Sequence, residues 1–218
     1  MKQSWQKNLI KAFWVFFIAS IIGCIIETIV CLVQKGHFEV RQGLIYGPFI
    51  PVYGAGAVLY YFTITKIKGA GKVFLASALL GGIIEYFFSY FQEKLFGTVS
   101  WDYSNLWFNI NGRTSLLHCL YWGTGGVLFT KLIYPYVNQL IDNLNNKIAF
   151  QYMSGVLIVF MFFNICISYV AADRQLERRE KIEATTSLDK LLDQYYPDKV
   201  MDTIYSNKQD REILLPKS

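Results

Sequence analysis

The sequence lacks most motifs that mark enzymes, nucleotide-binding proteins and metal sites. The stretch GAGK at 69–72 has neither the upstream glycine of a P-loop nor the Ser or Thr that follows its lysine, which argues against nucleotide binding. No HExxH or GxSxG string occurs, and the two histidines have no metal-ligand spacing. We therefore expect no metal and no bound cofactor, and we find no recognisable catalytic motif.

Cysteine pairs and basic stripes are also missing. The four cysteines, Cys24, Cys31, Cys119 and Cys166, form no CxxC pair, and all fall inside apolar stretches. Cys24 and Cys31 would lie about 10 Å apart along one helix, which is too far for a disulfide. The net charge of +5 comes without a basic stripe interleaved with aromatic residues, so we expect no nucleic-acid partner.

Long apolar runs are what the sequence has in abundance. Its mean hydropathy is +0.28, and 53% of its residues are hydrophobic, which is unusual for a soluble domain. Apolar runs of about 20 residues are long enough to cross a bilayer as helices. We predict an all-α integral membrane protein with a transmembrane helical domain over 1–172 and a polar C-terminal tail over 173–218. Five spans are expected, at about 12–34, 46–65, 73–96, 115–134 and 150–172.

The basic residues of the short loops favour a cytoplasmic N-terminus. Eight lysines precede the first span or lie in the second and fourth loops, whereas the first and third loops hold four basic residues. Five spans would then place the tail outside. The tail begins with Arg174, Arg178, Arg179 and Lys181, which favours the opposite side for it.

One short string occurs twice. IIGCIIE at 21–27 returns as LLGGIIE at 79–85, and YGAGAVL at 53–59 resembles WGTGGVL at 122–128 at an offset of 69. Residues that step by four, and so share a helix face, match at an offset of 58: Ala19, Gly23, Glu27 and Cys31 correspond to Ser77, Gly81, Glu85 and Ser89. We predict that the first four spans form two parallel repeats of two helices each.

Each copy of the repeat carries a carboxylate inside an apolar run. An acidic side chain at the centre of a membrane helix costs roughly 2.5–3.5 kcal/mol on insertion scales. Small residues mark places where membrane helices approach closely, so we expect Glu27 and Glu85 to point into the bundle. Arg41 and Arg113 each follow one of these glutamates and open the next helix, which makes them the expected partners.

These side chains predict a polar cavity in the outer half of the membrane. The residues expected to bind or couple ions there are Glu27, Glu85, Arg41, Arg113, Glu93 and Asp102. The secondary residues are His118, Trp101, Tyr103, Tyr46 and Pro48. The alternative is that Glu–Arg pairs only lock helices together, that the aromatic residues form an interfacial belt, and that the histidine is a packed polar residue. The prolines and glycines of YGPFIPVYG predict a broken or kinked start to the second span.

Several strings together resemble a known family. They are GxxxE (Gly23 and Glu27), YGPFIPVYGAG (46–56), EYFFSYFQEKLFG (85–97), WDYS (101–104) and NINGR (109–113). The chain resembles, over nearly its whole length, a bacterial family labelled ABC-transporter permease, type IV. The resemblance implies a multi-pass protein of the inner (cytoplasmic) membrane that is linked to transport. It also implies a separate ATPase subunit as a partner, because this chain has no ATPase of its own.

We therefore predict a membrane transport component in which Glu27 and Glu85 serve as cation or proton sites. One alternative is a membrane-embedded enzyme that acts on lipid or cell-wall precursors, with Glu93, Asp102 and His118 as acid or base groups. Another is a non-catalytic membrane scaffold or sensor that uses its tail. The expected surroundings are the lipid bilayer, and assembly with further copies of the chain stays open.

Overall fold

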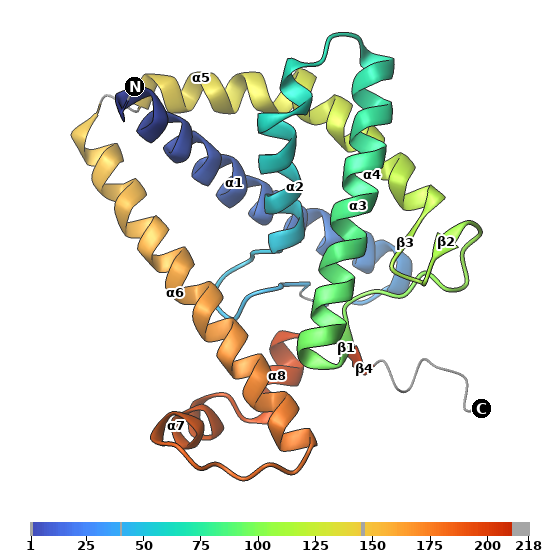
Figure 1. Cartoon of the computed structure of the whole chain (residues 1–218), viewed down its shortest axis with the longest axis vertical. Coiled ribbons are helices and arrows are strands. Elements are labelled where there is room, and N and C mark those ends of the chain that lie inside the picture. The colour runs from blue at the N-terminus through green and yellow to red at the C-terminus, as the bar shows by residue number, and fades with distance from the viewer. Residues whose placement is uncertain (1, 40, 145–146, 211–218) are drawn as a thin grey trace.

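Helices make up most of the computed structural model, which describes residues 2–39, 41–144 and 147–210 (Figure 1). In chain order the α-helices are α1 (Lys2–Lys35), α2 (Pro51–Phe62), α3 (Ala70–Phe96), α4 (Leu116–Leu128), α5 (Tyr134–Leu144), α6 (Ile148–Arg179), α7 (Ser187–Tyr195) and α8 (Asp198–Ile204). A 3₁₀ turn, Ile64–Lys66, follows α2, and a π-helical turn, Phe129–Ile133, joins α4 to α5. The predicted all-α class is confirmed.

The strands are short, and each strand pair joins two segments of the chain. β1 (Thr98–Val99) pairs antiparallel with β4 (Gln209–Asp210), which ties the tail to the segment that follows α3. β2 (Asn109–Ile110) pairs with β3 (Thr114–Ser115) in a hairpin between α3 and α4. The turn of that hairpin needs Gly112, which has a φ of 67°.

Within the described residues, three helical segments are long and apolar enough to cross a membrane: Lys7–Lys35, Ala70–Phe96 and Ile148–Arg179. They correspond to the first, third and fifth predicted spans. The second and fourth predicted spans contain shorter helices, since α2 has 12 residues and α4 has 13. Such helices extend only about 18–20 Å, against a hydrocarbon core of about 30 Å. Helix length and composition therefore support three of the five predicted spans, and the second and fourth stay predictions.

α2 is short because residues 41–50 run as a loop into the bundle instead of extending the helix. Pro51 begins the helix, at a position where the missing N–H costs nothing. The N–H of Ile50 donates to the carbonyl of Ser20, which lies in the middle of α1, at 3.1 Å. Leu44, Ile45 and Phe49 are buried. The predicted broken start of the second span is confirmed.

α6 supplies the hydrogen bonds that such a buried loop needs. The Asn164 side chain accepts from the N–H of Tyr46 at 3.1 Å and donates to its carbonyl at 2.7 Å. The Ser168 hydroxyl accepts from the N–H of Ile45 at 2.9 Å. Asn164 and Ser168 are themselves buried. These bonds fix the loop, and with it the depth at which α2 begins.

The bundle is built from two closely packed helix pairs, α1 with α2 and α3 with α4. In the first pair Gly23 faces the ring of Tyr53 so closely that a Cβ atom would overlap it. In the second pair Gly81 faces Trp122 in the same way. The two glycines are 58 residues apart and the two aromatic residues 69 apart, so the contacts follow the offsets of the repeated strings.

A second set of contacts obeys the same offsets. A Cβ atom added to Gly54 would lie 2.7 Å from the ring of Phe16, and one added to Gly123 would lie 2.8 Å from the ring of Phe74. In each pair the glycine of the later helix therefore accommodates an aromatic ring of the earlier one. Small residues at these crossings let the helices approach closely, as is usual in membrane bundles.

The tail is packed on the end of α6 rather than left in solvent. Leu192 of α7 and Met201 of α8 form a small core with Ile45, Ala171 and Ala172. The N-cap of α7 is Thr186, which forms a capping box with Asp189. α6 continues without a break from the fifth predicted span into this tail.

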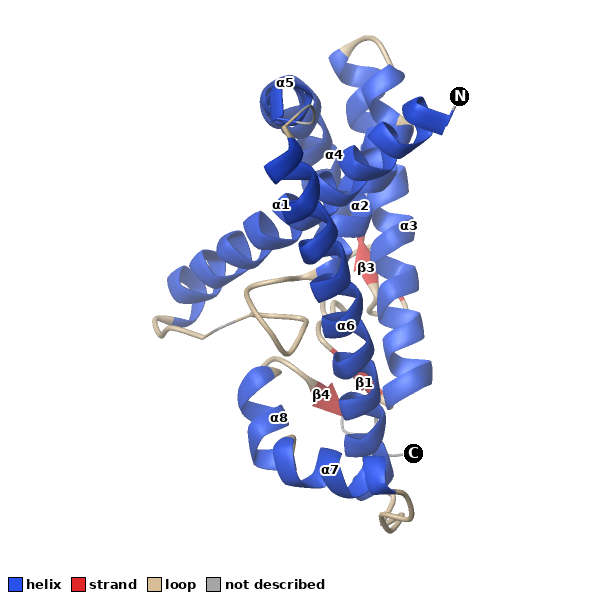
Figure 2. Ribbon diagram, turned by 90° about the vertical axis from the view of Figure 1, so that its left-hand side faces the viewer, coloured by secondary structure: helices blue, strands red, loops and turns tan. Residues whose placement is uncertain are grey.

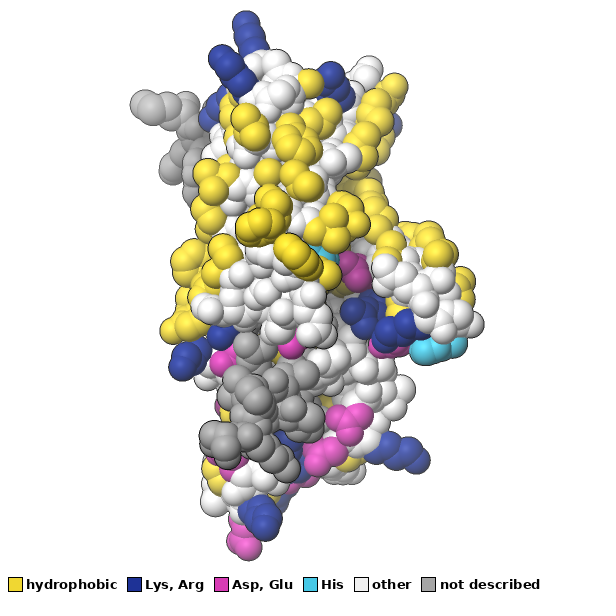
Figure 3. All heavy atoms as spheres, turned by 90° about the vertical axis from the view of Figure 1, so that its right-hand side faces the viewer, with side chains coloured by type: hydrophobic (Ala, Val, Ile, Leu, Met, Phe, Trp, Pro, Cys, Tyr) yellow, Lys and Arg dark blue, Asp and Glu magenta, His cyan; other side chains and the backbone are white. Residues whose placement is uncertain are grey.

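Charge pairs hold the tail to α6. Arg174, which is 4% exposed, makes two parallel hydrogen bonds of 2.9 Å to the carboxylate of Asp193 in α7. Arg178 contacts Asp193 and Asp198, each at 2.7 Å. The tail end of the molecule lies opposite the end that holds the N-terminus, α5 and the turn between α2 and α3 (Figures 1 and 2). Between these ends, hydrophobic side chains cover much of the face in Figure 3.

The glycine–aromatic contacts predict which glycines tolerate a side chain. Gly81→Ala should lower stability, because the new methyl group meets Trp122 and overpacking of this kind costs about 1–3 kcal/mol. Gly125→Ala in α4 is the matched control: nothing lies within 4 Å of its added Cβ, so stability should hold or rise. Thermal unfolding of the purified protein in detergent measures both. Equal midpoints for Gly81→Ala and wild type would contradict the packing described.

Acidification should release the tail. The hydrogen bonds from Arg174 lower the pKa of Asp193 to about 2, against an ordinary value of about 3.9. Since the released tail binds this proton more readily, the stabilisation is fully present above about pH 4 and is lost as the pH falls towards about 2. Hydrogen exchange of α7, corrected for intrinsic rates, should show protection that declines over this range.

Asp193→Asn should weaken the protection of α7 at pH 7 and reduce its dependence on acid. Glu177→Gln is the control, because Glu177 also contacts Arg174, at 2.7 Å, but lies on α6 itself and does not join the two helices. If Asp193→Asn behaved like wild type at every pH, the ion pair would not be what docks the tail.

Candidate functional site

A cavity of about 1020 Å³ lies between the two helix pairs, α6 and the tail. Its walls come from α1, α2, α3, α4 and α6, from the segments before α2 and after α3, and from residues 205, 207 and 208 of the tail. Most of this lining is aliphatic or aromatic. Because both helix pairs contribute, the cavity is the place where the two repeated acidic positions can meet.

Glu85 is the more buried of the two acids, with 6% of its surface exposed. Its neighbours on the same face of α3, Ser77, Gly81 and Ser89, are buried as well. The hydroxyl of Tyr103 donates to one carboxylate oxygen at 3.1 Å, and the hydroxyl of Thr114 donates to the other at 2.7 Å. The Tyr103 bond draws the loop after α3 across the cavity, and the Thr114 bond anchors strand β3.

Glu27 lies on α1 and is half-buried. The hydroxyl of Tyr53, from α2, donates to its carboxylate. Glu27 and Glu85 both line the cavity and are close enough to interact electrostatically. Among the residues that the structure describes, neither carboxylate forms an ion pair, so neutral hydroxyl groups are the donors that hold both in place.

The expected arginine partners are bound elsewhere. Arg41 lines the cavity, but its guanidinium contacts Glu39 at 3.3 Å instead of Glu27. Glu39 also accepts from Lys35 at 2.7 Å, and this contact is the main reason that its pKa falls to about 2. The expectation that Arg41 pairs with Glu27 is therefore wrong, because Arg41 forms its ion pair with Glu39, a nearer acid in the same loop.

Arg113 pairs with Glu93 at 2.7 Å and not with Glu85. It is 8% exposed, and its guanidinium lies over the rings of Tyr86 and Tyr90 at 5.7 and 5.4 Å. Eight residues, or about 12 Å along α3, separate Glu93 from Glu85. The hairpin brings Arg113 level with the end of α3, so the residue locks the loop to that helix.

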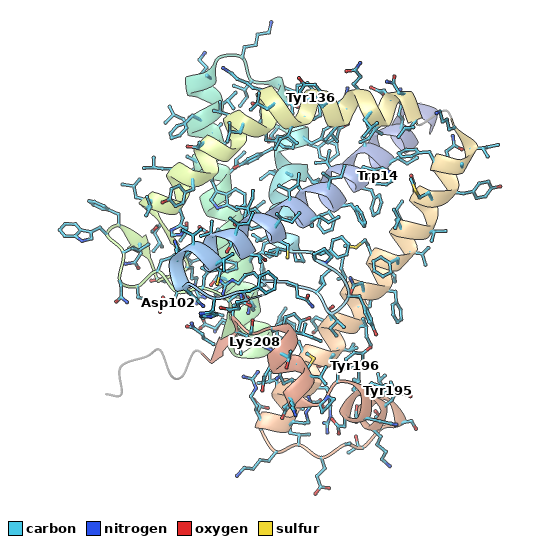
Figure 4. All side chains as sticks on the ribbon, turned by 180° about the vertical axis from the view of Figure 1, so that it is seen from behind. Trp14, Asp102, Tyr136, Tyr195, Tyr196 and Lys208 are labelled. Carbon is cyan, nitrogen blue, oxygen red and sulfur yellow. The ribbon has the colours of Figure 1, made fainter. Side chains whose placement is uncertain are left out.

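Some predicted residues stand apart from the cavity. Glu93, Arg113 and Asp102 are not among its lining residues. The carboxylate of Asp102 accepts from the N–H and the hydroxyl of Ser104, at 3.0 and 2.6 Å, and so shapes a turn of the third loop. Figure 4 labels Asp102 in this loop.

The secondary residues also divide into two groups. His118 lines the cavity, stacks on Tyr103 with ring centroids 3.6 Å apart, and bonds to the Ser115 hydroxyl at 2.8 Å. Trp101 lines it too, and its indole N–H donates to the Arg113 carbonyl at 2.9 Å.

Tyr46 and Pro48 are exposed and lie outside the cavity lining. The Tyr46 hydroxyl instead meets the hydroxyl of Tyr196 in the tail at 2.6 Å.

Three residues of the site were not singled out from the sequence. Tyr53 and Trp122 open the two glycine-rich strings, so the repeat itself marked them as equivalent. Each stands next to the glutamate of its own helix pair, because the Trp122 indole interacts with Glu85 as the Tyr53 hydroxyl does with Glu27. No pattern in the sequence marked Thr114, because the register of the β2–β3 hairpin is what brings this residue to Glu85.

The Arg113–Glu93 pair predicts a measurable coupling. Arg113→Met and Glu93→Met should each destabilise the protein by about 2–3 kcal/mol, below the roughly 3–5 kcal/mol of a fully buried pair, because Glu93 is 22% exposed. The double variant should lose less than the sum of the two single losses.

Glu85→Gln provides the comparison for this cycle. Combined with Arg113→Met it should give additive losses, since the two residues form no pair. Chemical unfolding in detergent measures each variant. Coupling of Arg113 to Glu85 with none to Glu93 would overturn the assignment.

Comparisons with known proteins bear on this arrangement. No curated protein and no solved structure matches the chain. A family model matches residues 14–169, a range that holds α2, α3 and α4, most of α1 and α6, and both cavity glutamates. On the strength of that match, the chain belongs to the family described as "Putative ABC-transporter type IV".

Proposed function

We propose that this protein is the membrane-embedded component of a transport system, and that the cavity between its helix pairs is the substrate path. The observation that carries the proposal is the pair of acids: Glu27 and Glu85 come from different helix pairs, line one cavity and have only neutral donors among the described residues. Acids in this setting are typical of ion or substrate pathways. The family description supports the same class of function.

The chain crosses the membrane five times in this proposal. α2 with the loop before it makes the second crossing, and α4 with the π-helical turn makes the fourth. An odd number of crossings puts the N-terminus and the tail on opposite sides, and their places at opposite ends of Figure 1 support this. The lysine-rich end would be cytoplasmic, in the inner membrane of a bacterium.

The two helix pairs are parallel repeats in this view. The matched contacts of Gly23 with Tyr53 and of Gly81 with Trp122 support it, because they keep the offsets of the repeated strings. An axis along the membrane normal would then bring Glu27 and Glu85 to the same depth on opposite walls. Both acids lie towards the ends of α1 and α3 that are nearer the C-terminal tail of the chain. With the N-terminus cytoplasmic, this depth is in the outer half of the membrane.

The two carboxylates would work as a pair. A cation or a proton between the two carboxylates would offset the repulsion of their like charges. The hydroxyls of Tyr53, Tyr103 and Thr114 keep the carboxylates oriented when that cation leaves. The site would thus alternate between a loaded and an empty state without rebuilding its own hydrogen bonds.

An ATPase subunit as a partner is compatible with the family description. α5 offers a surface for it at the proposed cytoplasmic end. Asp142 of α5 is held to Lys7 and Lys11 of α1 at 2.9 Å each. Tyr136, labelled in Figure 4, is 73% exposed on the same helix.

The enzyme alternative receives less support from the geometry. It needs Glu93, Asp102 and His118 to converge on one substrate, but only His118 lines the cavity. Glu93 is engaged by Arg113, and Asp102 by Ser104. The transport proposal uses the acids that do share a cavity.

Flux through reconstituted protein tests the proposal. Proteoliposomes incubated with a cell metabolite extract should enrich at least one solute over empty liposomes, as measured by mass spectrometry of their contents. Glu27→Gln/Glu85→Gln should lose this enrichment, because the amides keep the shape of the site but cannot neutralise a cation. Trp107→Leu, a change at an exposed residue of the third loop outside the cavity lining, is the control and should transport normally.

Two checks make the result interpretable. The variants must insert into liposomes in equal amount and unfold at similar temperatures. Enrichment by the double variant equal to that by wild type would refute the role of the two acids.

A further inference from the structure

The size and lining of the cavity carry information about what it holds. Its volume of about 1020 Å³ is far larger than an inorganic ion and is in the range of organic ligands. Apart from the acidic pair, the walls near α1 and α3 are apolar and include Ile22, Ile26, Phe88 and Phe91. A ligand that fills such a space has an apolar body.

The acidic end of the cavity has the composition of a site for organic cations. Tyr53 and Trp122 lie with ring centroids 5.5 Å apart and 30° between planes, beside Glu27 and Glu85. Tyr103, which donates to Glu85, stacks on His118 with ring centroids 3.6 Å apart, and all four rings line the cavity. Aromatic faces attract ammonium groups, and carboxylates beside them add a full charge.

The basic residues of the lining have other partners. Arg41 is paired with Glu39, and the ammonium of Lys208 donates to Gln175 at 3.0 Å and lies over the rings of Phe96 and Tyr205. Lys208 is labelled in Figure 4, where the tail meets the bundle. Glu27 and Glu85 form no ion pair among the described residues, so this acidic pair is available to a cationic group.

We propose that the cavity binds a cationic amphiphile, with its ammonium head between Glu27 and Glu85, against the four rings, and its apolar body along α1 and α3. This assignment rests on the proposed function, since it names the substrate class of the same cavity. The assignment is narrower than the proposed function, because a transport component that carries another class of solute would not need to bind a cationic amphiphile.

Binding of a simple probe tests the assignment. The intact protein is placed in nanodiscs of uncharged and zwitterionic lipid, and radiolabelled dodecyltrimethylammonium is added below its micellar concentration. Nanodiscs without protein give the partition into lipid. We expect saturable binding above that background, displaced by unlabelled probe but not by dodecanoate or dodecyl maltoside, which have the same chain length. No binding above empty nanodiscs, or equal displacement by dodecanoate, would overturn the proposal.

Head and body are tested separately. Tetramethylammonium, which has the head alone, should compete at least about tenfold more weakly, because it leaves the apolar walls unfilled. Equal competition by tetramethylammonium and unlabelled dodecyltrimethylammonium would show that the site binds the ammonium head without an apolar body. This series uses only the wild-type protein, so it is independent of how any variant folds.

Variants locate the site. Glu27→Gln/Glu85→Gln should weaken binding by about tenfold or more, since a charged contact becomes a neutral one. Trp107→Leu is the control, because Trp107 is 87% exposed in the third loop and does not line the cavity. Unchanged binding in the double variant would place the probe elsewhere and sink the assignment.

The outcome is separable from that of the transport experiment. If solute enrichment depends on Glu27 and Glu85 while dodecyltrimethylammonium does not bind, the ligand class is wrong and the transport function stands. If the probe binds as described but no solute is enriched, the ligand site stands and the protein uses it for something other than transport on its own.

Discussion

Two carboxylates held inside an apolar helix bundle are the constraint on which the rest of this structure depends. Each needs hydrogen-bond donors at membrane depth, where water is scarce. The protein supplies hydroxyl groups rather than cations: Tyr53 for Glu27, and Tyr103 with Thr114 for Glu85. Neutral donors stabilise a carboxylate without cancelling its charge, so the acids keep their attraction for a cation.

Bringing those donors into place explains several features that look unrelated. Gly23 lets α2 approach until Tyr53 reaches Glu27, and Gly81 lets α4 approach with Trp122 beside Glu85. The loop before α2 ends deep in the bundle, where Asn164 and Ser168 satisfy its backbone. The helix therefore begins at a depth that presents its first turn, including Tyr53, to the cavity.

The sequence predicted the parts of this arrangement that depend on local pattern. Apolar runs predicted the helices, the prolines and glycines of 46–54 predicted a broken helix start, and the repeat pointed to Glu27 and Glu85 together. It failed for the arginines, because which acid an arginine meets depends on loop geometry. Glu39 and Glu93 lie nearer to Arg41 and Arg113 than the cavity acids do, and nothing in the spacing distinguishes them. The packing of the tail on α6 was not predicted either. The tail is mostly polar, and its composition does not reveal the apolar contact that Leu192 and Met201 make with the end of α6.

The two acids are not equivalent, and the difference gives the cavity a direction. Glu85 is nearly inaccessible and is held by two hydroxyls, whereas Glu27 is half-buried and is held by one. In the proposed pathway, a cation would therefore meet Glu27 more readily and would displace fewer hydrogen bonds to reach it. Glu85, held by Tyr103 and Thr114, would then retain the cation at the less accessible position. The two acids also differ in where their donors come from: Tyr103 reaches Glu85 from the loop after α3, whereas Tyr53 reaches Glu27 from α2 itself.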